Sequence, residues 1–349
     1  MYDTIVYVYP QWHVVSFTYV AKAHIQALRE AGYKVIELDE RKLDSNQHFD
    51  FPVIIHPFFF NKDRIPKAPI VIGVDVIETT CVSRSIYDAL SKVDFLIVPS
   101  KFSKYVLEKL GYNNVFVVPH FMPKEFDRPV RNPNNPLLKW IQKCKLKEGW
   151  LGILYHIPHS GLRKGALEAF EIFHALRLKY DSRKFKPILK RVDIKDYLLG
   201  ALWTLDCIDI EGRFDIHDYI DVIDISDAHL CVSRAGGFEI PALESIYRGV
   251  PTFAPVCGCF SEYAHLITVP LGCTYHPCHY DKFNMHVGFG WRVDIEDAVM
   301  KLSWFIEDPK PFKELALKRM EDARREFNFE IGSKRFVEVI DRILKVSGK

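Results

Sequence analysis

The sequence predicts an α/β protein made of two Rossmann-like, doubly wound domains. Three observations support this prediction. Apolar, β-rich segments alternate with segments of helical apolar spacing. The alternation runs in two series, separated by a stretch rich in proline and lysine. The 349 residues are enough for two domains of ordinary size. We therefore expect two parallel sheets, with a ligand at the carboxyl ends of their strands.

The first series opens with a β-α-β unit. TIVYVYP (4–10) is strand-like, a helical pattern follows and ends at Gly32, and KVIEL (34–38) is again strand-like. We expect an N-terminal domain over residues 1–125, followed by an interdomain connection at 126–150. The remaining segments of this series are PVIIHPFFF (52–60), APIVIGVDV (68–76), SRSIYDALSKV (83–93), DFLIVPS (94–100), KFSKYVLEKLGY (101–112) and NVFVVPH (114–120).

The second series predicts a C-terminal domain over residues 151–330, in which strands and helices again alternate. A last helix, within 331–349, ends the chain and is expected to cross back to the N-terminal domain. The segments are LGILYHI (151–157), KGALEAFEIFHALRLKY (164–180), FKPILKRV (185–192), IHDYIDVIDIS (216–226), AHLCVS (228–233), PALESIYRG (241–249) and VPTFAP (250–255), with helices near 294–307, 310–326 and 333–346.

The composition is that of an ordinary globular protein. It is 48% hydrophobic and 26% charged, with a formal net charge of +2, which gives no argument for a nucleic-acid partner. We find neither a basic leader nor a run of ~20 apolar residues, so we expect a cytoplasmic protein. Peripheral contact with an anionic membrane is the alternative, through the basic stretch 177–191 and Lys139, Lys143, Lys145 and Lys147.

Two phosphate-binding signatures are absent. A nicotinamide or flavin site would want G-x-G-x-x-G after the first strand, but VYVYPQWHVVS (6–16) has no glycine. The sequence GFG (288–290) lies far from any strand-to-helix entry, and a G-x-x-x-x-G-K-[ST] loop is missing. A dinucleotide enzyme is therefore disfavoured.

Two other segments carry the chemistry. HSGLRKG (159–165) precedes a long helix, so Arg163 and Lys164 stand where a diphosphate could be held, and a solvated turn is the alternative. In RAGGFEIPALE (234–244), glycines precede a helix that Pro241 can open, and their N–H groups could approach a phosphate. Glu244 could accept hydrogen bonds from sugar hydroxyls, or merely stabilise the helix start.

Together these segments resemble glycosyltransferases of the GT-B architecture, most closely the retaining enzymes of family four. The resemblance covers about residues 70–345. Its matching blocks are RKGALEAFEIFHAL (163–176), ISDAHLCVSRAGGFEIPALESIYRGVPTFAP (225–255) and, more loosely, DFLIVPSKFSKYVLEKLGYNNVFVVPH (94–120). The resemblance implies two Rossmann-like domains facing each other across a cleft.

The resemblance also assigns a donor site. Lys164, with Arg163, matches the basic position that contacts the donor diphosphate, and Glu244 matches the second glutamate of an E-x7-E motif, which binds the ribose. The first glutamate of that motif falls on Gly236 and is missing, and Glu239 stands three residues along as its candidate substitute. The implied catalytic residues are Lys164, Arg163 and Glu239, and the implied donor-binding residues are His159, Gly236, Gly237, Phe238, Ile240 and Glu244.

The acceptor side falls in the N-terminal domain. GVDVIETTCVSRS (73–85) resembles a segment of some family members, which makes Asp75 and Glu78 candidates for the cleft. The family's glycine-rich first loop is replaced by PQWHVVS, so Trp12 and His13 are candidates to line the acceptor pocket. A structural role is the alternative for His13.

The implied activity is transfer, with retention, of a sugar from a nucleotide diphosphate donor, UDP- or GDP-linked, to a hydroxyl of a glycan, lipid or small molecule. No cofactor or metal is expected, because cationic side chains can stabilise the leaving phosphate. The alternatives are a GT-B epimerase or phosphorylase and an inactive scaffold that binds carbohydrate or protein.

Four cysteines lie close together: Cys257, Cys259, Cys273 and Cys278. Their spacing fits no standard zinc motif, so we expect free thiols. A zinc site that includes His279 and a disulfide are the alternatives.

Overall fold

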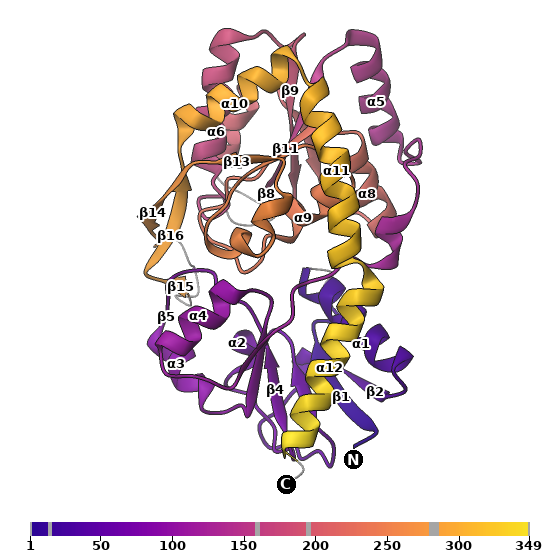
Figure 1. The fold of residues 1–349 in the computed structure, drawn as a ribbon, viewed down its shortest axis with the longest axis vertical. Coiled ribbons are helices and arrows are strands. Elements are labelled where there is room, and N and C mark those ends of the chain that lie inside the picture. Colours follow the sequence, from indigo (N-terminus) through magenta and orange to yellow (C-terminus); the bar gives the residue numbers. More distant parts are fainter. Residues whose placement is uncertain (1, 13–15, 158–160, 193–196, 279–285, 348–349) are drawn as a thin grey trace. The chain divides into compact units, whose positions relative to one another are not determined.

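The computed structural model describes residues 2–12, 16–157, 161–192, 197–278 and 286–347. The chain divides into two compact units: unit 1 takes residues 1–123, 281–288 and 326–349, and unit 2 takes residues 124–280 and 289–325. Each unit is built on a parallel six-stranded sheet (Figure 1). The predicted α/β fold with two doubly wound sheets is confirmed.

The sheet of unit 1 has the strand order β2-β1-β3-β4-β6-β7. The chain starts at β1, next to one edge, and steps outward to the edge strand β2. It then returns past β1, which places the reversal of direction between β1 and β3. The strands are β1 (Thr4–Tyr9), β2 (Lys34–Asp39), β3 (Val53–Ile55), β4 (Val71–Val74), β6 (Phe95–Val98) and β7 (Val115–Val117).

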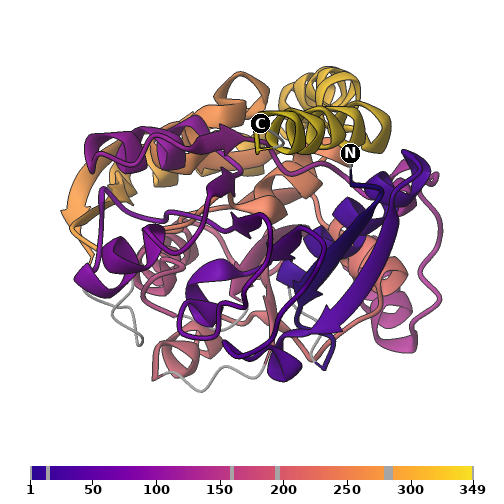
Figure 2. The same ribbon diagram turned by 90° about the horizontal axis from the view of Figure 1, so that it is seen from below.

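Alternate side chains of this sheet enter two separate cores, as the period of a strand requires. On one face Ile5 and Tyr7 pack with the apolar sides of α1 (Ser16–Glu30) and α12 (Phe329–Ser347). On the other face Val6 and Val8 pack with helices α2 (Phe58–Asn61), α3 (Arg84–Leu90) and α4 (Lys101–Lys109). Helix α12 is drawn in yellow in Figure 2.

Helix α12 is an integral part of unit 1, although about 200 residues separate it from Pro123. Its Phe336 ring stacks on His24 at a centroid distance of 3.9 Å. Gly332 lets the helix pack closely on Phe121, since a Cβ atom there would overlap the ring of that residue. A short antiparallel pair, β5 (Cys81–Val82) with β15 (His286–Val287), also belongs to this unit.

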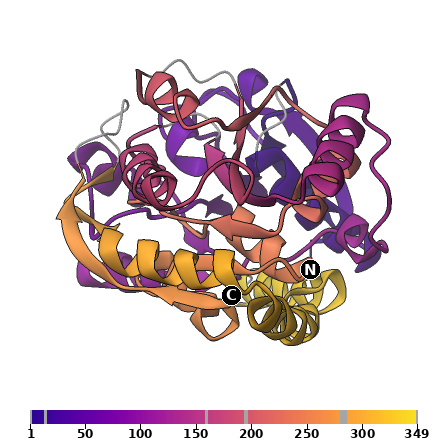
Figure 3. The same cartoon turned by 90° about the horizontal axis from the view of Figure 1, so that it is seen from above.

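The sheet of unit 2 has the order β10-β9-β8-β11-β12-β13. Helices α6 (Ala166–Lys179), α7 (Tyr197–Trp203) and α10 (Ile295–Glu307) share one core with it. Figures 1 and 3 show α6 and α5 on opposite sides of this sheet. The strands are β8 (Leu151–Ile157), β9 (Phe185–Arg191), β10 (Ile208–Glu211), β11 (Ala228–Leu230), β12 (Thr252–Pro255) and β13 (Val269–Leu271).

Unit 2 contains further elements besides this sheet and the three helices. They are η2 (Lys124–Asp127), α5 (Pro136–Glu148), α8 (Ile216–Asp224), α9 (Ile240–Tyr247), η3 (Gly258–Leu266), the antiparallel pair β14 (Cys273–Pro277) and β16 (Phe289–Val293), and α11 (Lys310–Phe327). One short helix, η1 (Glu40–Lys42), lies in unit 1. None of the helices within the described ranges combines the length and the apolar composition that crossing a membrane requires.

The segment at 126–150, expected to be a connection, is built into unit 2. The Tyr247 hydroxyl donates to Asp127 at 2.6 Å, and Arg248 donates to the backbone carbonyl of Phe126 at 2.8 Å. Lys145, on α5, forms an ion pair with Asp227 at 2.6 Å. Other predicted elements differ in detail: PVIIHPFFF splits into β3 and α2, and the last helix begins at Phe329.

Candidate active site

Two loops meet at the carboxyl edge of the unit 2 sheet. Strands β8 and β11 are neighbours, with β9 and β10 on one side of the pair and β12 and β13 on the other. The loop after β8 leads into α6, and the loop after β11 leads into α9. Ligands of doubly wound folds bind where the strand order reverses in this way. The two segments singled out from the sequence therefore lie at the switch point.

Gly165 allows the two loops to touch. Its φ of 77° is left-handed, and a Cβ atom there would overlap the carbonyl oxygen of Val232 in the other loop. The backbone N–H of Arg234 donates to the carbonyl of Arg163 at 2.8 Å. The backbone thus fixes the spacing of the two loops before any side chain contributes.

A buried ion cluster reinforces this contact. Glu168, in the first turn of α6, is fully buried and accepts hydrogen bonds from Nε of Arg234 and Nε of Arg292, each at 2.9 Å. Arg292 also donates to Glu171 at 2.9 Å. Removing one partner of such a cluster would leave a buried charge uncompensated. The cluster therefore holds the loop at Arg234 against α6.

Lys164 and Glu239 form an ion pair between the two loops, with side chains 12% and 7% exposed. Lys164 donates to Oε1 of Glu239, and the Ser233 hydroxyl donates to Oε2 at 3.0 Å. Glu239 has a left-handed backbone, with φ 56° and ψ 59°, at the start of α9. The ammonium and carboxylate groups are thus brought together from positions 75 residues apart in the sequence.

Contacts with η3 hold the glycine segment that directly precedes Glu239. Gly236, Gly237 and Phe238 are buried. The Tyr263 hydroxyl, on η3, lies 2.9 Å from the carbonyl oxygens of both Phe238 and Glu239 and donates to them. The rings of Phe238 and Tyr263 lie 5.3 Å apart. Phe238 therefore anchors the loop in the core.

Glu244 lies one turn further along α9. Its Oε2 accepts a hydrogen bond of 2.5 Å from the hydroxyl of Tyr219 on α8. Burial raises the pKa of the Glu244 carboxyl to about 7, although the Tyr219 hydroxyl favours the ionised form. Tyr219 also packs against His156, with ring centroids 5.7 Å apart. Glu244 is therefore a partly buried acceptor in α9, the helix that begins just after Glu239.

Three further residues of the predicted donor site are Arg163, Ile240 and His159. Arg163 donates to the carbonyl of Ala235 at 3.4 Å, and Ile240, partly buried, opens α9. His159 lies outside the described residues.

The acceptor candidates of unit 1 follow different strands. Trp12, after β1, is 51% exposed and donates to Glu40 at 3.0 Å. Asp75, after β4, accepts from the backbone N–H of Phe59 at 2.6 Å, and burial raises the pKa of its carboxyl to about 7. Glu78 is partly buried nearby in the chain, and His13 lies outside the described residues.

Three contributing residues were not identified from the sequence: Ser233, Tyr219 and Tyr263. Ser233 directly precedes the RAGG segment, so its position offered a signal. The two tyrosines come from α8 and η3, and nothing in the local sequence points either of them at this loop.

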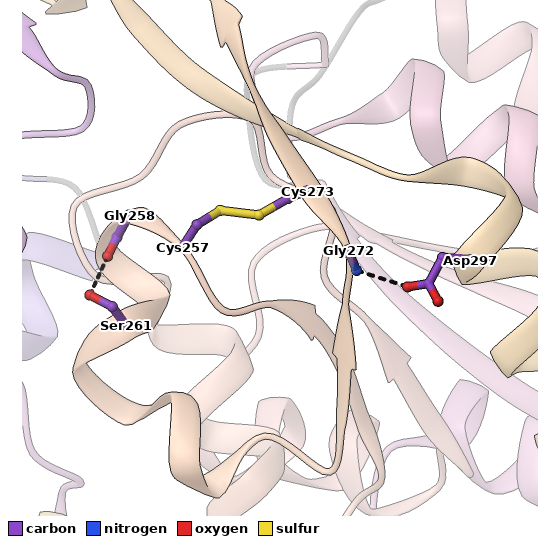
Figure 4. The surroundings of a disulfide bond; sticks show 6 residues. All are labelled: Cys257, Gly258, Ser261, Gly272, Cys273 and Asp297. Carbon is purple, nitrogen blue, oxygen red and sulfur yellow. Dashed lines mark hydrogen bonds between the residues drawn. A yellow bond between two sulfur atoms is a disulfide. The ribbon is translucent and has the colours of Figure 1, made fainter.

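The expectation of four free cysteines near the end of β12 is wrong for two of them. Cys257 and Cys273 form a disulfide that joins the residue before η3 to the first residue of β14 (Figure 4). Cys259 and Cys278 are buried free thiols. The local spacing gave no signal for this pairing, because it depends on how η3 folds back towards β14. Among the described residues no cluster of potential metal ligands is found.

Comparisons with known proteins bear on the whole chain. No protein-family model matches it. The chain is 25% identical, over 98% of its length and 99% of the relative's, to uncharacterized protein 356 of Sulfolobus islandicus rod-shaped virus 1. It is also 25% identical to "Putative glycosyltransferase 45" of Sulfolobus islandicus filamentous virus (isolate Iceland/Hveragerdi), over 82% of this chain and 80% of the relative.

Solved structures resemble both units together. A glycosyltransferase from Rickettsia africae matches with a TM-score of 0.68 at 15% identity, over 99% of both chains. Sucrose-phosphate synthase from Thermosynechococcus elongatus matches with 0.67 at 12% identity, over 99% of this chain and 100% of the other. HepE of Anabaena, solved with UDP-glucose, matches with 0.64 at 12% identity, over 97% of this chain and 99% of the other. The chain therefore has the GT-B fold of these glycosyltransferases, as its sequence predicted.

Proposed function

We propose that the protein is a retaining glycosyltransferase that moves a sugar from a UDP- or GDP-linked donor to a hydroxyl of a glycan, lipid or small molecule. The observation that carries the proposal is the Lys164–Glu239 pair at the switch point of the unit 2 sheet, with Glu244 following in α9. The GT-B fold and the viral glycosyltransferase relative support transfer chemistry, and the HepE complex supports a nucleotide-sugar donor.

The chemistry follows from the charges of the site. The bond between the sugar and the diphosphate breaks, and negative charge grows on the leaving phosphate. Lys164, Arg163 and the backbone N–H groups of Gly236 and Gly237 would stabilise that charge. The leaving phosphate would take the proton of the acceptor hydroxyl as the new bond forms on the same face of the sugar. Because side chains supply the positive charge, we propose that transfer proceeds in the presence of EDTA.

We assign Trp12, Asp75 and Glu78 to binding of the acceptor. Each follows a strand of the unit 1 sheet at its carboxyl end. An exposed indole can stack on a sugar or lipid acceptor, and the carboxylates can accept its hydroxyl hydrogen bonds.

The decisive test is donor binding, measured by thermal shift and donor hydrolysis with UDP-, GDP- and ADP-sugars. We expect one nucleotide to raise the melting temperature saturably, and Lys164→Ala and Glu244→Ala to weaken that shift. A chain stabilised by none of these donors would instead support the inactive scaffold.

We further propose that α5 makes a peripheral contact with anionic membranes. Its outer face exposes Trp140 by 55% and Leu146 by 78%, beside the exposed Lys139, Lys143 and Lys147. Indole and leucine side chains enter the headgroup region, while lysines pair with lipid phosphates.

Vesicle flotation tests this contact. We expect binding to vesicles of equal phosphatidylglycerol and phosphatidylcholine but not to phosphatidylcholine alone. Reversing the three lysines to glutamate should abolish it, whereas Trp304→Ala, an exposed tryptophan on α10, should not. No binding to either vesicle, or equal binding to both, would contradict the proposal.

A further inference from the structure

The space beside Gly236 is occupied by a side chain from three residues further on. A Cβ atom built on Gly236 would overlap Oε1 of Glu239 and lie 2.7 Å from its Cδ. No side chain at residue 236 could therefore coexist with Glu239 in its observed place. The absence of a side chain at Gly236 leaves the space that the Glu239 carboxylate fills, so the two residues depend on each other.

The backbone of Glu239 makes this arrangement possible. A left-handed φ of 56° is uncommon outside glycine and is energetically unfavourable for a residue with a Cβ atom. It turns the side chain back towards the preceding glycines. A residue at a helix start commonly caps its own helix, but the Glu239 side chain makes no such hydrogen bond. It points instead at Lys164 and Ser233.

The Glu239 carboxylate retains unused acceptor capacity in this place. Its two oxygens offer about four lone-pair sites, and Lys164 and Ser233 use one on each oxygen. A carboxylate attracts hydroxyl donors and repels phosphates. Lys164, in contrast, keeps ammonium protons for an anion. The pair thus presents a phosphate-binding group and a hydroxyl-binding group side by side, which is the order of groups in a nucleotide sugar.

We infer that Glu239 binds the sugar of the donor. Its carboxylate accepts hydrogen bonds from the sugar hydroxyls, and it lies in the space that a side chain at residue 236 would otherwise fill. This inference rests on the proposed function. It separates the roles of the ion pair, since Lys164 serves the diphosphate and Glu239 serves the sugar.

The first test compares two ligands by calorimetry: the nucleotide sugar that stabilises the wild type most, and the corresponding nucleoside diphosphate. We expect Glu239→Gln to weaken binding of the nucleotide sugar about tenfold or more and to change diphosphate binding by less than about twofold. Lys164→Met should weaken both. Glu296→Gln, an exposed glutamate on α10, is the matched control and should change neither.

A residue swap provides the second test. Gly236→Glu alone should lower the melting temperature, because its side chain collides with Glu239. Glu239→Gly alone should keep the fold, since glycine tolerates the left-handed backbone, but lose sugar binding. We expect the double variant Gly236→Glu/Glu239→Gly to bind the nucleotide sugar more tightly than Glu239→Gly, because a carboxylate again fills the vacated place.

The outcomes separate this inference from the proposed function. If the wild type binds no nucleotide sugar, both fail. If the wild type binds one and Glu239→Gln weakens sugar and diphosphate ligands equally, Glu239 only positions Lys164 and the inference is overturned alone. It is also overturned if Glu239→Gln changes neither affinity, or if a folded double variant binds no better than Glu239→Gly.

Discussion

Glu239 and Asp206 are the two non-glycine residues with a positive φ among those the structure describes. Of these, Glu239 lies in the candidate site, where its strained backbone is held by Tyr263, Ser233 and Lys164. Strain of this kind persists when surrounding contacts over-determine it, and it concentrates at functional sites. The residue that fills the space beside Gly236 is thus also the residue with the unusual backbone.

Lys164→Met tests the charge of the site at constant side-chain volume. We expect turnover with the best donor to fall about 10²- to 10³-fold, because a cation is lost where negative charge develops. Unfolding should become easier by about 1 to 3 kcal/mol, since Glu239 is left buried without its partner. Adding Glu239→Gln should recover stability without recovering turnover.

Lys318→Ala, an exposed lysine on α11, controls for the loss of charge as such. Unchanged turnover in Lys164→Met would contradict the assignment of the diphosphate to this residue.

Three buried histidines in unit 1 make its stability depend on pH. The Tyr7 hydroxyl lies 2.9 Å from Nδ1 of His24 and 3.4 Å from Nδ1 of His56. Burial lowers the pKa of His24, and lowers those of His56 and His120 to about 3. Below about pH 6.5 the unfolded chain binds protons that the folded chain excludes. The histidine contribution to the free energy of unfolding should therefore fall between about pH 6.5 and pH 3, by about 1 to 2 kcal/mol per histidine down to pH 5. Asp75 acts in the opposite direction, because burial raises the pKa of its carboxyl to about 7.

Urea unfolding at pH 7, 6 and 5 measures this dependence. His56→Phe should make it shallower, whereas His48→Gln should not, because His48 is 70% exposed. An equal pH dependence of the wild type and His56→Phe would show that the cluster takes up its protons while folded.

At the residue scale, the sequence predicted the two loops but not the link between them. Arg163, Lys164 and the RAGG glycines were identified because each adjoins the start of a helix. The contact of Lys164 with Glu239 was not predicted, because it depends on a left-handed backbone that glutamate rarely adopts.

At the scale of elements, the alternation of strands and helices could be predicted because parallel strands buried on both faces are nearly continuous apolar runs. Helix α5 was missed. Its segment PLLKWIQKCKLKE has lysines at four positions and begins with a proline. Two more prolines and three asparagines lie just before it, within 128–135, so this composition concealed the helical pattern. Only Leu138 and Ile141 of this helix are buried.

The disulfide Cys257–Cys273 should stabilise unit 2. It joins residues 16 apart, and closing a loop of this length contributes about 3 kcal/mol in the chain-entropy account. Figure 4 shows what surrounds it: Ser261 donates to Gly258 at 2.6 Å, and the Gly272 N–H donates to Asp297 at 2.8 Å. We expect dithiothreitol to lower the melting temperature.

The variant Cys257→Ala/Cys273→Ala should have the melting temperature of the reduced protein, and dithiothreitol should not change it. The melting temperature of Cys81→Ala should respond to dithiothreitol as that of the wild type does. An equal effect of dithiothreitol on the paired-cysteine variant would show that the disulfide is not the cause.

Gly332 sets how closely α12 packs in unit 1. Gly332→Val would drive a side chain into the ring of Phe121, so we expect a loss of stability of about 1 to 3 kcal/mol, visible in the unfolding midpoint. Lys334→Val, at an exposed position of the same helix, introduces the same β-branched residue and should cost little more than its helix propensity. Equal effects of the two would contradict close packing at Gly332.

At the scale of the whole molecule, unit 1 is assembled from three separate stretches of chain. Deleting 326–349 would remove α12, whose Phe336, Ile340, Ile343 and Leu344 are all buried. Four such side chains contribute about 6 to 12 kcal/mol, which is comparable with the stability of a whole domain. We expect unit 1 to unfold and unit 2 to persist, so that limited proteolysis cleaves within residues 2–123 first. Equal protection of both units would contradict this.

The same connectivity decides the order in which the chain can fold as it is made. Unit 2 has all of its residues by Arg325, whereas residues 1–123 must wait for α12 before their sheet is covered on both faces. Pro123 and Phe329 are about 200 residues apart, which a ribosome crosses in roughly 10 to 40 s. During that interval the first-made third of the chain lacks α12 on one apolar face of its sheet, so the nascent chain should depend on chaperones at its beginning and release them only at its end.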